Sequence, residues 1–129
     1  MDAAVLRFTT ALFDVSREPA NDINPIYGQL VLVWLAEKLE GEVLVPAPET
    51  EDWGWYVDVT WQGRNYMVGS SASEEEENGR REWVLQIVKH RSLKEKMMGR
   101  EKMTRDDGLV QLLLRTLRVE PAFQDVVLE

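Results

Sequence analysis

Hydrophobic and polar residues alternate most strictly between positions 55 and 61. The apolar residues of this stretch occupy every second position: Trp55, Val57, Val59 and Trp61. A period of two is that of a β-strand with one buried and one solvated face. Gly63–Arg64 can form a two-residue turn with glycine first, which would pair Trp61 with Tyr66. The apolar faces of both strands then coincide, so the pattern predicts a β-hairpin.

Weaker strand patterns occur in four further segments: residues 3–14, 42–49, 81–89 and 123–128. The first is ambiguous, because its apolar residues fit a helical stripe as well as a strand face. Its β-branched and aromatic residues favour a strand. Two prolines end the segment 42–49, which is typical of an edge strand.

Two segments carry the period of an amphipathic helix. The first begins after Asn24, which can cap it, and ends at Gly41. The second begins after Thr104, with Asp107 at capping-box spacing, and carries its apolar stripe on residues 109–117. Between the strands and this second helix, the pattern of residues 92–103 predicts a short basic helix or an irregular arm, interrupted near Gly99.

The predicted element order is strand, helix, four strands, helix, strand. Successive hairpins require antiparallel pairing, and two amphipathic helices can cover one face of the resulting sheet. The sequence therefore predicts an α+β two-layer sandwich. Residues 1–129 have the length of one domain and contain no linker.

Charge is distributed unevenly along the chain. The formal net charge is −8, yet residues 89–105 carry seven Lys or Arg against two Glu. An acidic body argues against nucleic acid as a partner, because phosphate binding needs basic surface. The run of four glutamates at 74–77 predicts a solvated acidic loop. An acidic protein partner of the basic segment 89–105 is the interaction that these charges favour.

Residue types with catalytic or metal-binding chemistry are scarce. The chain has no cysteine, and its only histidine, His90, stands between Lys89 and Arg91, which oppose protonation and metal binding. No nucleophile elbow, phosphate-binding glycine loop or calcium loop is present. We therefore predict no catalytic residue, no metal and no cofactor. The methionines of the basic segment are expected to fill gaps over the core, which favours a solvated connector over a membrane-binding helix.

Two groups of residues are candidates for ligand or partner binding. In the first, Glu51 and Asp52 precede the aromatic pair Trp53 and Trp55, where Gly54 can bend the chain and release the Trp53 side chain. Carboxylates beside an aromatic wall can bind a small molecule. The second group comprises the basic residues Lys94, Lys96 and Arg100.

Several short stretches follow one order along the chain: "RFTTALFDV", "PIYGQ", "EDWGWYVDV", "YMVG", "VKHRS" and "PAFQDVVL". In this order the chain resembles a family of small uncharacterised bacterial proteins that share an EDWGW element before a β-meander. The resemblance implies no activity and no catalytic residue. Similar proteins often carry "GCGN" at the turn after Gly69, where this chain has serine.

The sequence favours a non-enzymatic binding protein, of which a toxin-neutralising immunity protein is one version. A small-molecule pocket or enzyme that uses Glu51 and Asp52 beside Trp53 is the alternative. A homodimer that pairs an edge strand, Val43 to Val45 or Phe123 to Leu128, is a third. The N-terminus lacks a signal-peptide pattern and no apolar run spans a bilayer, so we expect a cytoplasmic protein without membrane contact.

Overall fold

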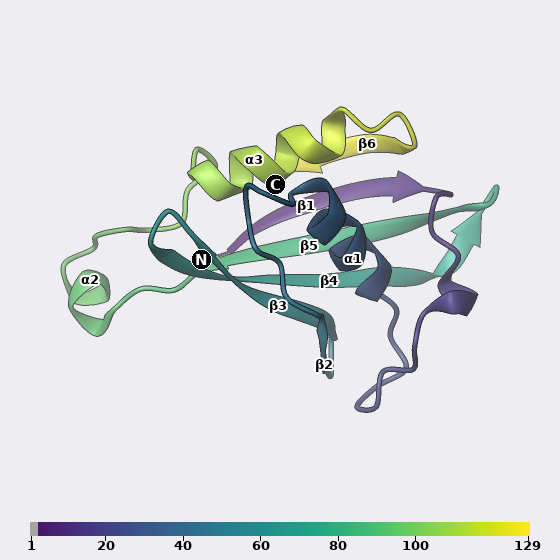
Figure 1. Cartoon of the computed structure of the whole chain (residues 1–129), viewed down its shortest axis with the longest axis horizontal. Helices are drawn as coiled ribbons and strands as arrows, with labels where there is room; N and C mark the ends of the chain where they lie inside the picture. Colours follow the sequence, from purple (N-terminus) through teal and green to yellow (C-terminus); the bar gives the residue numbers. More distant parts are fainter. Residues whose placement is uncertain (1–2) are drawn as a thin grey trace.

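Six antiparallel strands form one open sheet in the computed structural model, which describes residues 3–129 (Figure 1). The strands are β1 (Ala3–Thr10), β2 (Glu49–Glu51), β3 (Gly54–Trp61), β4 (Arg64–Glu77), β5 (Arg80–Lys89) and β6 (Phe123–Leu128). They lie in the order β2-β3-β4-β5-β1-β6. Helices α1 (Gln29–Lys38) and α3 (Gly108–Arg118) cover one face, and the short α2 (Leu93–Met97) extends beyond one end of the sheet (Figure 1). The predicted α+β class and element order are confirmed.

The first segment is a strand, as its β-branched content predicted. Leu6, Phe8 and Thr10 point into the core, and the residues between them are only half-buried. β1 lies between β5 and the C-terminal strand β6. The first and last strands of the chain therefore pair in the sheet, and β6 forms its edge on this side.

The central hairpin forms with a different turn from the predicted one. Trp61 pairs with Arg64 and Val59 with Tyr66, two residues away from the expected register. Gln62 and Gly63 are the turn residues, and both have positive φ, 49° and 77°. Positive φ at both turn residues is typical of a type I′ turn, which like the expected type II′ turn matches the twist of the flanking strands. A shift of two preserves which side chains face the core, so the apolar pattern could not detect it.

The predicted strand at 42–49 is wrong in its position. Residues 43–48 have no regular structure, Val43 is buried and Leu44 is exposed. The edge strand β2 begins only at Glu49 and pairs with β3. The prolines at 46 and 48 lack the N–H that a strand ladder needs, so they delay the strand until the chain has passed them.

The first long helix begins later than predicted. Tyr27 pairs with Ala72 in an isolated β-bridge, so the helix cannot start at Asn24. Gly28 is the N-cap, and the Glu18 carboxylate accepts a hydrogen bond from its backbone N–H at 2.7 Å. Burial raises the pKa of Glu18 more than these hydrogen bonds lower it. At the other end Gly41 has the positive φ expected of a helix stop.

The acidic run at 74–77 is a strand instead of a loop. β4 continues to Glu77, and Asn78–Gly79 forms a tight turn in which both residues have positive φ. A register shift between Ala72 and Glu76 interrupts its pairing with β5. The four glutamate side chains are exposed, as the charge pattern required.

The core lies between the helix-covered face of the sheet and the two helices. Its largest fully buried side chains are Trp83, Phe8, Leu6, Leu32, Leu35, Leu85 and Ile87. The opposite face of the sheet has no helix over it (Figure 1). We call this second surface the open face.

Candidate functional site

The acidic half of the EDWGW element is a tight turn held by two asparagines. Glu51 pairs with Gly54 across the turn, and Asn21 Nδ2 donates to the carbonyls of both, at 3.0 and 2.8 Å. Asn24 Nδ2 donates to the carbonyl of Asp52 at 2.8 Å. The turn is therefore tied to the loop that precedes α1. Its carbonyls are engaged, and the carboxylate of Asp52 faces solvent.

The two tryptophans of this element lie on opposite faces of the sheet. Trp55 is 4% exposed on the core side, where its Nε1 donates to the carbonyl of Ile26 at 3.1 Å. Trp53 lies flat over Gly69 on the open face, so close that a side chain at 69 would occupy the space of its ring. The structure therefore does not bring Trp53 and Trp55 together as one aromatic wall.

Two positions of this region, Gly54 and Gly69, have no room for a side chain. The backbone at Gly54 has φ 152° and packs against the carbonyl of Ser70 on β4. Gly69 lies within β4, so the chain has a strand where the EDWGW resemblance suggested a turn. Both glycines allow a close approach that a Cβ would block. Packing against the sheet therefore accounts for the tryptophans and the glycine of the EDWGW element.

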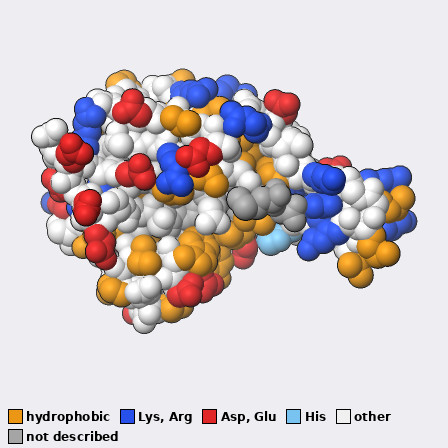
Figure 2. All heavy atoms as spheres, turned by 180° about the vertical axis from the view of Figure 1, so that it is seen from behind, with side chains coloured by type: hydrophobic (Ala, Val, Ile, Leu, Met, Phe, Trp, Pro, Cys, Tyr) orange, Lys and Arg blue, Asp and Glu red, His pale blue; other side chains and the backbone are white. Residues whose placement is uncertain are grey.

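The second candidate group lies on a projecting segment, residues 90–103, which we call the basic arm. The arm leaves the end of β5, forms α2 and returns to α3 clear of the body (Figures 1 and 2). Lys94, Lys96 and Arg100 are all exposed on it. Leu93, Met97 and Met98 are exposed as well, at 74%, 79% and 52%. The expectation that the arm's methionines fill gaps over the core holds for Met103 only, which packs against it.

The arm is anchored by a two-point ion pair. Arg64 on β4 donates from Nη1 and Nη2 to the two carboxylate oxygens of Glu95, each at 2.9 Å. Glu95 also accepts from the backbone N–H of Ser92, and the Ser92 hydroxyl accepts from that of Glu95, which completes a capping box. The Arg64 guanidinium and these hydrogen bonds lower the pKa of Glu95 to about 2. A helix of five residues is thus held in one orientation.

A second set of contacts fixes the base of the arm. Lys89 at the end of β5 contacts Glu101 at 3.1 Å and Asp107 at 3.2 Å. Asp107 is buried, accepts the Tyr66 hydroxyl at 3.0 Å, and caps α3 through the N–H groups of Leu109 and Val110. Asp107 thus replaces Thr104 as the cap of this helix. Burial, and then the Asp107 charge, raises the pKa of Tyr66.

These side chains line a hollow of about 360 Å³ at the base of the arm, with Trp61 and Thr104 on its wall. Trp61 covers Gly108 at the start of α3 and is only half-buried. The charged groups of this hollow are matched to one another: Lys89 to Glu101 and Asp107, and Arg64 to Glu95. Their arrangement explains the geometry of the arm without a bound molecule.

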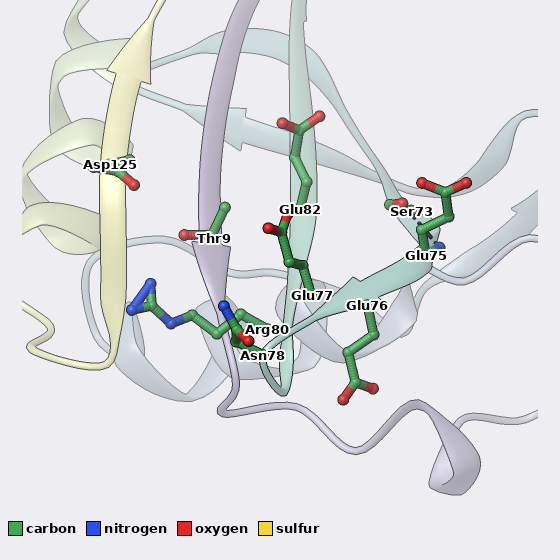
Figure 3. A pocket seen from close by; sticks show the side chains of 9 residues that line it. All are labelled: Thr9, Ser73, Glu75, Glu76, Glu77, Asn78, Arg80, Glu82 and Asp125. Carbon is green, nitrogen blue, oxygen red and sulfur yellow. Dashed lines mark hydrogen bonds between the residues drawn. The ribbon is translucent and has the colours of Figure 1, made fainter.

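Another hollow lies at the opposite end of the sheet, on the open face (Figure 3). It has a volume of about 780 Å³, and we call it the acidic hollow. Its lining residues are Thr9, Ser73, Glu75, Glu76, Glu77, Asn78, Arg80, Glu82 and Asp125. They come from four strands and the β4–β5 turn, and Arg80 extends from that turn towards β6 (Figure 3).

Sequence reasoning did not find the acidic hollow. The run at 74–77 signalled exposed carboxylates, but Glu82 and Asp125 join them only through strand pairing. β1 places Thr9 opposite Glu82 on one side and Gln124 on the other. Arg81 donates to the carbonyls of Ser73 and Glu74, which holds the interrupted part of β4 in place. A pattern of neighbouring residues cannot show that residues from four strands lie together.

Residues 3–129 contain neither a metal-binding cluster nor a membrane-spanning helix. No group of three His, Asp or Glu side chains there is arranged to hold a metal ion. No helix in the same range is long and apolar enough to cross a membrane. His90, the lone histidine, is the first residue of the arm and is exposed.

Comparison with known proteins leaves the chain without an assigned relative. No family model, no curated protein and no solved structure matches it. The resemblance to the EDWGW proteins therefore stays a prediction.

Proposed function

We propose that this protein is a non-enzymatic binding protein that holds an acidic protein surface with its basic arm. The observation that carries this proposal is the exposure of Leu93, Met97 and Met98 beside Lys94 and Lys96 on a segment fixed by the Arg64–Glu95 pair. Exposing a cluster of large apolar side chains to water costs free energy, and such clusters are typical of interaction sites. Apolar contact supplies affinity, and surrounding cations select an acidic partner.

The anchoring of the arm supports the same function. A bidentate guanidinium–carboxylate pair and a capping box order a segment that contributes no fully buried residue to the core. Because the arm is ordered before it binds a partner, less conformational entropy is lost on binding. Methionine side chains adapt their shape to the surface they meet, which suits a contact region.

The alternative, a small-molecule site at Glu51, Asp52 and Trp53, has less support. The turn carbonyls are bonded to Asn21 and Asn24, and the indole of Trp53 lies on Gly69. A toxin-neutralising immunity protein remains one version of the binding function. In that version the toxin would be a basic enzyme, and it would bind the acidic body of the protein instead of the arm.

A direct binding measurement tests the proposal. A polyglutamate peptide is titrated into the protein by calorimetry at low and at physiological ionic strength. We expect binding that weakens with salt and is lost in the double variant Lys94→Glu/Lys96→Glu. The matched control Arg17→Glu/Arg115→Glu changes the same number of exposed charges away from the arm and should bind like the parent. Equal binding by both variants would refute a role for the arm.

A further inference from the structure

The two charged surfaces of the molecule lie at opposite ends of its long axis. The basic arm extends from one end of the sheet, and the β4–β5 turn with the acidic hollow forms the other (Figure 1). Residues 74–82 carry five glutamates against two arginines, and residues 89–105 carry seven Lys or Arg against two glutamates. The arm of one molecule is therefore too far from its own acidic hollow to neutralise it.

The open face connects these two ends. Its central residues are half-buried and largely apolar: Val5, Trp53, Tyr56, Met67, Val84 and Val88. Figure 2 shows the molecule from this side, with hydrophobic side chains between the acidic side chains and the arm. Arg7, a cation on this face, is already paired with Glu82 and Glu129. On the same face Asp58 lies exposed opposite Met67, so the β3 side of the apolar centre is acidic.

We infer that the open face is covered by a second copy of this chain, with the basic arm of each copy in the acidic hollow of the other. The inference rests on the proposed function of the arm and names its acidic partner. A two-fold axis in the plane of the interface and perpendicular to the strands produces this arrangement. It places apolar centre on apolar centre and brings unlike ends together twice.

The charge distribution selects this arrangement over the other symmetric one. A two-fold axis parallel to the strands would superimpose arm on arm and acidic hollow on acidic hollow, so like charges would repel. An unrelated partner would have to carry the same two charged ends and an apolar centre at the same spacing. A second copy carries them by construction. The hollow is also large enough, at about 780 Å³, to admit Lys and Arg side chains.

Complementary charge reversal tests the inference. The full chain, the arm variant Lys94→Glu/Lys96→Glu and the hollow variant Glu75→Lys/Glu77→Lys are compared by sedimentation velocity over a dilution series. We expect the parent to dimerise and each variant alone to associate about 100-fold more weakly, because two attractive charges at each contact become repulsive. An equimolar mixture of the two variants should dimerise again. In the mixed dimer the substituted side chains of one contact are reversed on both sides, and the other contact is unchanged.

Two controls connect the result to the open face. Arg17→Glu/Arg115→Glu should dimerise like the parent, and Val84→Asp should not dimerise. A parent that stays monomeric at low salt and high concentration would overturn the inference. So would a mixture of reversed variants that fails to associate although circular dichroism shows both to be folded, or a Val84→Asp protein that dimerises normally.

The same proteins separate this inference from the proposed function. The hollow variant keeps an intact arm, so polyglutamate should still bind to it. Binding of polyglutamate by a parent that never dimerises would leave the arm's function standing and overturn the second copy as its partner. Dimerisation that the arm variant retains would overturn the arm-to-hollow contact.

Discussion

The Tyr66 hydroxyl donates a hydrogen bond to Asp107 Oδ2 at 3.0 Å, which joins the middle of the sheet to the start of α3. Both side chains are buried, and Lys89 contacts the same carboxylate oxygen. One carboxylate thus links β4, β5 and a helix N-terminus. Asp107 is therefore one of the residues that fix the base of the arm, together with Glu101.

Removing the hydroxyl should weaken this junction moderately. Tyr66→Phe leaves Asp107 with Lys89 and two backbone N–H donors, so we expect a loss of about 1–2 kcal/mol in the free energy of unfolding. Urea denaturation followed by circular dichroism measures it. Tyr56→Phe, on the open face, is the matched control and should have a smaller effect.

The Tyr66–Asp107 hydrogen bond makes the stability of the protein depend on pH in the alkaline range. The pKa of Tyr66 is raised above its ordinary value of 10 by burial and by Asp107. The native protein therefore keeps a proton that the unfolded chain loses, and stability falls as the pH rises above about 10. Denaturation curves at pH 8 to 11 should show this decline, and Tyr66→Phe should reduce it. An unchanged slope in the variant would contradict the assignment.

Replacing the carboxylate should cost more than replacing the hydroxyl. Asp107→Ala removes the N-cap of α3 and leaves Tyr66 and Lys89 without their shared acceptor, so we expect a loss of about 2–4 kcal/mol. Thermal or urea unfolding measures the change. Thr104→Ala tests the position that the sequence pattern favoured as the cap and should have little effect. A similar loss in both variants would contradict the assignment of Asp107 as the cap.

A methyl group at position 69 should displace Trp53. Gly69→Ala puts a Cβ where the Trp53 ring now lies, so the indole must move into solvent or distort the turn. We expect a red shift of the tryptophan emission and a loss of about 1–3 kcal/mol. Ser71→Ala, on the same strand and the same face, serves as the control. An unchanged spectrum in Gly69→Ala would show that Trp53 does not cover this glycine.

Acid should release the arm only at very low pH. Because the pKa of Glu95 is lowered to about 2, its pairing with Arg64 is complete above about pH 4.5 and is lost as the pH falls towards 2. The methyl signals of Met97 and Met98 in an NMR titration should therefore stay constant from pH 7 to 5. Glu95→Gln removes the ion pair and should shift these signals already at pH 7. A transition near pH 4.5 in the parent would show that the pair does not form.

The EDWGW turn should depend on Asn21 more than on Asn24. Asn21 donates to two turn carbonyls and its Oδ1 accepts from the N–H groups of Ile23 and Asn24. Asn21→Ala should cost about 1–3 kcal/mol, because partly buried carbonyls lose their donor. Asn24→Ala, which removes one exposed donor to Asp52, should cost less. Chemical denaturation of both variants checks the order.

Local pattern determined the element type where the hydrophobic period was strict, but it failed for the acidic run at 74–77, which is a strand, and for residues 43–48, which have no regular structure. Strict alternation at 55–61 can bury one face only as a strand, and the leucines of 109–117 can do so only as a helix. The element order follows, since short turns join neighbouring strands. The exposure of the glutamates at 74–77 also follows from their charge, whatever structure carries them.

Tertiary structure decided what these elements place together. The register of the central hairpin moved by two residues without changing a buried face, because strand periodicity is blind to even shifts. Trp53 and Trp55 lie on opposite faces because Trp53 belongs to the turn before β3 and packs on Gly69 of β4. The acidic hollow exists because β1, β4, β5 and β6 meet at one end of the sheet. These relationships join residues far apart in the chain, and a periodic pattern contains only neighbours.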